Sequence, residues 1–180
     1  MNRSCVFALS RWLPGIAAIC FYLMVGAGAG IGVANADAAN YDIDGYLFAT
    51  GEASDFAETS ALKVRRTSMV ATFAARDEAS PLHLATYSCA FVSHTTTDTE
   101  TRHQSRVGLT GACLVTDRTG DSHVAEWHRT PGEEAGTWSI VRGSGKYEAA
   151  SGAGSYTITF LSGPPDIQLR FALSGQLILE

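Results

Sequence analysis

The stretch IQLRFALSGQLIL, residues 167–179, alternates between apolar and polar side chains with a period of two. Its apolar positions share one parity and its polar positions share the other: Ile167, Leu169, Phe171, Leu173, Leu177 and Leu179 against Gln168, Arg170, Ser174 and Gln176. Because successive side chains of a strand point to opposite faces, this alternation predicts a strand with one buried face. Residues 155–161, SYTITFL, repeat the pattern.

Six further runs towards the N-terminus are typical of strands, at residues 46–53, 61–75, 82–93, 106–116, 122–129 and 137–143. Turn-forming residues separate several of them, at 77–81, 117–121, 131–132 and 163–165. Eight short strands without an amphipathic helix predict an all-β fold. A single eight-stranded antiparallel β-barrel of the calycin type is favoured over a sandwich, because closure removes the exposed edges.

Residues 1–36 have the character of a signal peptide. They carry only two charges, both arginine, followed by a long apolar run and the small-x-small sequence Ala-Asn-Ala at 34–36. The sequence therefore predicts a cleaved signal over 1–36, a barrel domain over 37–180, and a secreted or periplasmic protein. An uncleaved membrane anchor is the alternative, since about 20 apolar residues span a bilayer.

The charge of the chain limits its partners. The net charge is −5, and it becomes −7 once the two arginines of the signal segment are removed. No basic stripe is present, so a nucleic-acid partner is not expected, nor is an anionic membrane surface after cleavage of the signal.

Cys89 and Cys113 are the two cysteines that remain after cleavage. In an exported chain an even pair predicts a disulfide, worth about 3 kcal/mol by the chain-entropy argument. The midpoint of the pair is Thr101, in a polar segment suited to a hairpin tip. A metal pair is the alternative, but two cysteines without C-x-x-C spacing make a weak zinc site.

The segment RGSGKYEAASGAGSY, residues 142–156, has the composition of a phosphate-binding loop but not its pattern. A P-loop needs glycine at 140 and a hydroxyl residue at 147, where the chain has Ile140 and Tyr147. We therefore expect a turn between strands. Its structural residues are Gly143, Gly145, Lys146, Tyr147, Gly152 and Gly154, with the glycines supplying positive φ angles or close backbone approach.

This turn, together with GACLVTDRTGDSHVAEW at 111–127, resembles small secreted bacterial proteins of the allene oxide cyclase and dirigent barrel superfamily. The resemblance covers about residues 108–156. It implies an eight-stranded barrel able to hold an apolar molecule, and relatives that act without a cofactor. It transfers no catalytic residue. Within the turn we expect the Lys146 ammonium to be solvated and the Tyr147 ring to pack against the barrel end.

Four aromatic residues are candidates for a ligand cavity in the barrel, although such residues often fill a core instead: Trp127, Trp138, Tyr156 and Phe160. On the strand SHVAEWHR, Glu126 and His128 share one face. They could act as acid and base or bind a metal, but a polar outer face is favoured. The remaining histidines, His83, His94 and His103, show no metal-binding spacing.

Three functions fit these observations. The favoured one is binding of a small apolar ligand without catalysis, with no cofactor and no metal. The second is a cofactor-free isomerase, cyclase or stereochemical guide, by analogy of fold alone. The third is an interaction protein of the cell envelope with a filled barrel.

Overall fold

The computed structural model describes residues 38–101, 107–163 and 166–180. The predicted signal segment 1–36 and His103 lie outside the described residues. The described residues belong to one compact unit.

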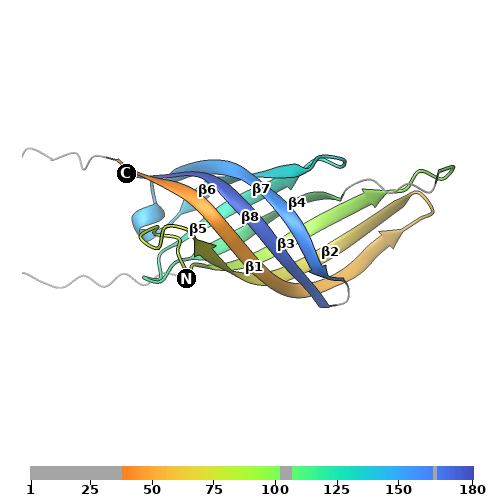
Figure 1. Cartoon of the computed structure of the whole chain (residues 1–180), viewed down its shortest axis with the longest axis horizontal. Coiled ribbons are helices and arrows are strands. Elements are labelled where there is room, and N and C mark those ends of the chain that lie inside the picture. Colours follow the sequence, from red (N-terminus) through yellow and green to blue (C-terminus); the bar gives the residue numbers. More distant parts are fainter. Residues whose placement is uncertain (1–37, 102–106, 164–165) are drawn as a thin grey trace, which may run out of the picture. The chain divides into compact units, whose positions relative to one another are not determined.

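Eight antiparallel strands close into a barrel, each pairing with its neighbours in the chain, and β1 with β8 (Figure 1). The strands are β1 (Ala39–Glu58), β2 (Leu62–Ala75), β3 (Thr86–Thr96), β4 (Gly108–Thr116), β5 (Ser122–Arg129), β6 (Ala135–Gly143), β7 (Ser151–Ser162) and β8 (Asp166–Leu179). The predicted all-β barrel of eight strands is confirmed.

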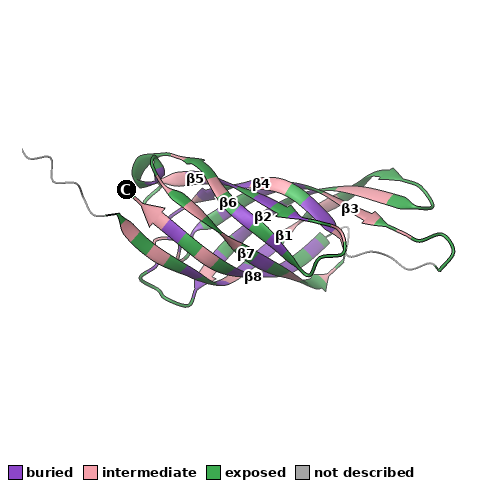
Figure 2. Ribbon diagram, turned by 90° about the horizontal axis from the view of Figure 1, so that it is seen from above, coloured by how far each residue is buried: buried purple, intermediate pink, exposed green. Residues whose placement is uncertain are grey.

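Burial alternates along the strands, as the sequence pattern requires (Figure 2). On β8, Ile167, Leu169 and Phe171 point inward and are buried, whereas Gln168 and Arg170 face outward and are exposed. The core is therefore the barrel interior, filled from the inner face of every strand.

The predicted disulfide is confirmed. Cys89 on β3 lies directly opposite Cys113 on β4, with the two Cα atoms 4.0 Å apart and a disulfide joining the sulfur atoms. The paired residues of β3 and β4 lie at equal distances from position 101 along the chain. The hairpin is therefore centred on the position that the sequence predicted.

The two ends of the barrel differ. One end carries the β2–β3 loop (76–85), the β4–β5 turn (117–121) and a 3₁₀ helix, η1 (Gly145–Tyr147), and we call it the closed end. The opposite end, where β1 turns into β2 and β5 into β6, is the open end. Residues 82–85, predicted as strand, belong to the closed-end loop, where Leu84 has a φ of 62°.

The glycine-rich segment is a strand connection, as predicted, but shorter than expected. Gly145 has a φ of +59°, in the left-handed region that favours glycine. Gly152 and Gly154 lie within β7, which begins at Ser151.

Within residues 38–101, 107–163 and 166–180, no helix has the length and apolar character needed to cross a bilayer.

Candidate functional site

Aromatic rings fill the centre of the barrel. The Trp127 ring lies 4.7 Å from that of Tyr156 and 5.7 Å from that of Phe171, measured between centroids. The rings of Tyr87 and Phe91 approach its other edges at 6.5 and 6.3 Å. Edge-on and tilted contacts at these distances are favourable for aromatic pairs, so this layer is a packed core.

Three of the four predicted ligand residues belong to this packed region. Trp127, Trp138 and Tyr156 are 2%, 5% and 1% exposed. The space beside the two tryptophans is only about 10 Å³, too small for an organic molecule. Their position inside the barrel is as expected, and their role in ligand binding stays a prediction.

Trp138 owes its place to two glycines. It sits on β6 opposite Gly154 of β7, which in turn pairs with Gly175 of β8. A Cβ atom on Gly154 would come within 2.7 Å of the indole nitrogen, so a side chain there would displace the ring. The indole donates a hydrogen bond to the Ser174 carbonyl oxygen at 3.2 Å. Gly154 of β7 and Gly175 of β8 therefore make room for a core tryptophan.

A cavity of about 90 Å³ occupies the open end, beyond the aromatic layer. Its apolar lining comes from Ala53, Met69, Val107, Leu109, Ile158, Phe160, Ile167 and Leu169, and its polar lining from Lys63, Arg65, Thr67, Ser93, Thr95 and Arg129. The two kinds of side chain are unevenly distributed around the cavity. The polar residues come from β2, β3 and β5, whereas β7 and β8 contribute only apolar ones.

Phe160 lines this cavity but is not enclosed. Its side chain is 58% exposed, so it lies at the mouth of the barrel rather than among the packed rings, and its role in ligand binding stays a prediction. The alternation that buries Tyr156 continues to Phe160, but by that point β7 has passed the packed core and reached the mouth of the barrel.

The cations of the cavity wall are held in fixed positions. Arg65 donates from Nε to Asp55 Oδ1 at 2.8 Å, and Lys63 pairs with Asp55 Oδ2 at 2.8 Å and with Glu58 at 3.3 Å. Hydrogen bonds from Arg65 and Lys63 hold the pKa of Asp55 below its ordinary value. These ion pairs lie near the mouth, where the side chains are partly exposed.

Arg129 lies deeper. It is 6% exposed and follows Trp127 on the inner face of β5, one inward position closer to the open end. Its Nε donates to the Val107 carbonyl oxygen at 2.8 Å. Burial raises the pKa of nearby Tyr156 to about 12, and the positive charge of Arg129 acts in the opposite direction. The guanidinium is thus a fixed positive charge next to the floor of the cavity.

A second polar cluster seals the closed end. The Asp117 carboxylate, whose side chain is 1% exposed, pairs with the Lys146 ammonium and accepts a hydrogen bond from the Tyr147 hydroxyl at 3.0 Å. Thr119 donates to the other oxygen from its backbone nitrogen at 2.8 Å and its hydroxyl at 2.7 Å. Asp117 lies in the segment 111–127 and Lys146 in the turn 142–156, so the two segments that carry the resemblance contact each other.

This cluster corrects one expectation and confirms another. Lys146 is not simply solvated, because its ammonium neutralises a buried carboxylate. Tyr147 is fully buried at the barrel end, as predicted. The sequence could not reveal the ion pair, since its partners are far apart in the chain and meet only when the barrel closes.

The pKa values at the closed end follow from these contacts. Burial alone would raise the pKa of Asp117, but hydrogen bonds from Lys146, Thr119 and Tyr147 outweigh it and hold the pKa well below its usual range. Burial lowers the pKa of His123 to about 4, although the charge of Asp117 opposes the shift. The imidazole ring lies 4.8 Å from the Tyr147 ring, and its Nδ1 has no hydrogen-bond partner among the described residues.

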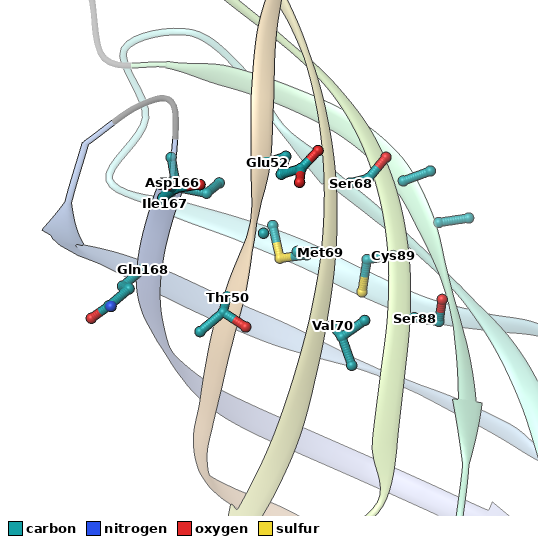
Figure 3. A pocket seen from close by; sticks show the side chains of 13 residues that line it. Thr50, Glu52, Ser68, Met69, Val70, Ser88, Cys89, Asp166, Ile167 and Gln168 are labelled. Atoms are coloured by element: carbon teal, nitrogen blue, oxygen red, sulfur yellow. The ribbon is translucent and has the colours of Figure 1, made fainter.

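The outer surface carries an open groove of about 650 Å³ across β8, β1, β2 and β3, with β4 at its edge. Thr50, Val70 and Ser88 lie side by side on three neighbouring strands of this groove (Figure 3). Glu52 and Asp166 face each other across β1 and β8 at one edge.

Glu126 and His128 lie on the outer face of β5, where both are exposed, as the favoured interpretation required. The His128 ring nitrogen Nδ1 is 3.3 Å from the Thr110 hydroxyl. Across residues 38–101, 107–163 and 166–180, no three His, Cys, Asp or Glu side chains are grouped so that they could hold a metal ion.

Comparison with known proteins gives structural neighbours only. No protein-family model and no curated protein matches the chain. A crystal structure of a DUF3224-family protein of unknown function from Shewanella oneidensis MR-1 is similar, with a TM-score of 0.48 and 15% identity over 75% of this chain and 96% of that one.

Two pterocarpan synthase dirigent proteins are also similar. The first has a TM-score of 0.45 and 12% identity over 79% of this chain and 92% of its own. The second has a TM-score of 0.40 and 13% identity over 79% and 96%. The neighbours thus include dirigent proteins. This is the superfamily that the turn motif resembles, and at such identities the likeness says nothing about activity.

Proposed function

We propose that this barrel binds a small, largely apolar organic molecule in the cavity at its open end. The observation that carries the proposal is the sidedness of the cavity: β7 and β8 present Ile158, Phe160, Ile167 and Leu169, opposite a polar wall from β2, β3 and β5. Ligand sites are typically concave and mostly apolar, with a few polar groups that fix orientation. The cavity is small, so it suits a short chain or one end of a longer molecule.

Binding without catalysis is favoured over an isomerase or cyclase. Acid–base chemistry needs a group that can give up or accept a proton near neutral pH, such as a histidine or a carboxylate. Among the described residues that line the cavity, the ionisable ones are Lys63, Arg65 and Arg129. Arginine stays protonated throughout this range, so these groups are better suited to holding a ligand than to moving protons.

We place this function outside the cytoplasm. The buried Cys89–Cys113 disulfide supports that location, since disulfides persist in oxidising compartments. The signal-like character of residues 1–36 supports it as well.

Calorimetric titration with octan-1-ol, an uncharged eight-carbon probe, tests the binding site. We expect saturable binding by the wild type and a loss of binding in Ile158→Trp, where the larger ring fills the cavity. Thr157→Trp, on the outward face of the same strand, is the matched control and should bind as the wild type does. Equal binding by both tryptophan variants would place the site elsewhere and overturn the proposal.

The outer face is the second candidate, as a surface for a protein partner. Phe48, Val70 and Leu114 are exposed by 52%, 56% and 49% on β1, β2 and β4. If the wild type does not bind octan-1-ol, this face becomes the stronger candidate. Sedimentation of the wild type and of Val70→Ser would then show whether it mediates self-association.

A further inference from the structure

A second, smaller cavity lies between the loop of the closed end and the aromatic layer. Leu82 of the β2–β3 loop lines it from one side, and Trp127 and Trp138 of the aromatic layer line it as well. All of its lining residues are buried. Its volume is about 10 Å³, which is enough for one water molecule and too little for anything larger.

Three side chains of this lining carry polar atoms that lack a hydrogen-bond partner. Nδ1 of His123 and Nε1 of Trp127 are buried and unpaired among the described residues. The Tyr87 hydroxyl likewise makes no hydrogen bond to a described residue. Trp138 differs, because its indole already donates to the Ser174 carbonyl oxygen. The rest of the lining has no polar side-chain atom: Ile43, Leu82, Ala125 and Leu173.

The register of the barrel brings the three unpaired residues together. Tyr87 on β3 and His123 on β5 both pair with Val115 of β4, so they flank it on the inner face. Trp127 lies two inward positions beyond His123 on β5, and its ring meets the Tyr87 ring edge-on at 6.5 Å. Three polar groups therefore meet at one cavity whose other walls are apolar.

We infer that this cavity binds a single water molecule, held by hydrogen bonds to Tyr87, His123 and Trp127. An indole N–H can only donate, so the water accepts a hydrogen bond from Trp127. The water donates to Nδ1 of His123, and it shares a further hydrogen bond with the Tyr87 hydroxyl, which can donate or accept. Three partners are typical of a buried water. The site is independent of the ligand cavity at the open end.

The water satisfies polar groups whose burial would otherwise be costly, since an unpaired buried donor or acceptor loses its hydrogen bonds to solvent. It also determines which nitrogen of His123 carries the proton. A neutral imidazole that accepts at Nδ1 is protonated at Nε2. Burial lowers the pKa of His123 to about 4 and raises the pKa of Tyr87, so both partners are neutral at pH 7.

A crystal structure of the exported protein, at a resolution that shows ordered water, tests the inference. We expect one peak of electron density in the cavity, about 2.7–3.2 Å from at least two of the three polar atoms. Crystals kept under xenon pressure should show no xenon there, because xenon enters cavities that are apolar and dry. A cavity without density, or one that takes up xenon in the wild type, would overturn the inference.

Oxygen-17 magnetic relaxation, which counts long-lived waters in solution, then tests the partners. The double variant Tyr87→Phe/His123→Leu leaves Trp127 as the only polar group of the three, so it should hold one long-lived water fewer than the wild type. Tyr156→Phe is the matched control, because its hydroxyl is also buried and unpaired but does not line this cavity. An unchanged count in the double variant, or the same loss in Tyr156→Phe, would refute the assignment. The wild-type crystal structure decides the matter if the double variant does not fold.

Nitrogen-15 NMR of the imidazole gives a readout that needs no substitution. At pH 7 we expect Nε2 of His123 to be protonated and Nδ1 to be a hydrogen-bond acceptor. A proton found on Nδ1 at this pH would contradict the proposed hydrogen bond from the water.

Discussion

Asp117 shows how one residue can determine the architecture of a barrel end. A buried carboxylate is costly unless it is paired and hydrogen-bonded. Here it accepts hydrogen bonds from Thr119 and Tyr147 and pairs with Lys146. Thr119 belongs to the β4–β5 turn, and Lys146 and Tyr147 belong to η1. The hydrogen bonds and the ion pair of this one carboxylate therefore hold the β4–β5 turn and η1 together.

Removing the Lys146 ammonium should therefore destabilise the protein. Lys146→Ala leaves the Asp117 carboxylate buried with only its neutral donors. The Lys146 side chain is 34% exposed, so solvent moderates the loss, and we expect the free energy of unfolding to fall by about 1–2 kcal/mol. Denaturant unfolding measures it. Arg142→Ala, an exposed neighbour on β6, is the control and should stay within about 0.5 kcal/mol of the wild type. Equal stability of the two variants would show that the ion pair contributes nothing.

His123 should make the protein sensitive to acid. Burial lowers its pKa from 6.5 to about 4, so the unfolded chain binds a proton in a range where the folded protein does not. The stability due to neutral His123 is complete above pH 6.5 and is lost as the pH falls to about 4. The loss should be about 3 kcal/mol over that interval.

Unfolding measured at half-unit steps from pH 7.5 to 4 tests this expectation. His123→Leu should flatten the decline, whereas His128→Leu, at an exposed position of the same strand, should retain it. A wild-type curve with no slope between pH 6.5 and 4.5 would contradict the assigned role of His123.

At the scale of the elements, alternation in the sequence was sufficient to predict all eight strands. It works because one face of each strand is buried, so that a shift of one residue would expose the core. It failed at residues 82–85, where Leu82 and Ala85 are buried in a loop instead of a strand. Apolar side chains that cap a barrel end have the same composition as those of a strand, and the period alone does not separate them.

The candidate site was less predictable. Along β2 the inward parity changes from Phe73 and Met69 to Thr67, Arg65 and Lys63, which is a sign of a polar interior near the open end. Such a change is ambiguous without the structure, because a strand that leaves the core shows it too. The aromatic candidates were conspicuous in the sequence for the same reason that they are unsuited to an open site: large rings fill space.

The disulfide between β3 and β4 should stabilise the folded protein. Because it is buried, it should also resist mild reductants. Replacing both Cys89 and Cys113 by alanine should lower the free energy of unfolding by about 3 kcal/mol, by loss of a covalent restraint on the unfolded chain. In the folded protein the two cysteines are 5% and 0% exposed, so a reductant has little access.

Thiol alkylation after treatment with dithiothreitol, with and without denaturant, separates these effects. Modification should require denaturant. Rapid labelling of both cysteines in the folded protein would show that the β3–β4 pair opens far more readily than its burial implies.

At the scale of the whole molecule, the barrel is divided along its axis. A sealed end holds the buried Asp117 cluster, an aromatic layer fills the centre, and the open end keeps a small cavity with cations on one side. The buried ion pair and the proposed ligand site therefore lie at different ends of the barrel. Substitutions at the closed end should alter unfolding, while Ile158→Trp in the open-end cavity should alter the affinity for octan-1-ol with little effect on the fold.

Export is the last expectation, and it concerns the chain as a whole. A signal peptidase recognises small residues on either side of one variable position, as in Ala-Asn-Ala at 34–36, so the exported protein should begin at Asp37. Its intact mass should lack residues 1–36 and be lighter by the two thiol hydrogens lost in the Cys89–Cys113 disulfide. Ala36→Trp should block cleavage, whereas Asn35→Gln, at the variable position, should be processed normally. A wild-type mass that retains the first 36 residues would establish the alternative, in which the apolar segment remains as an anchor and the barrel works at the membrane surface.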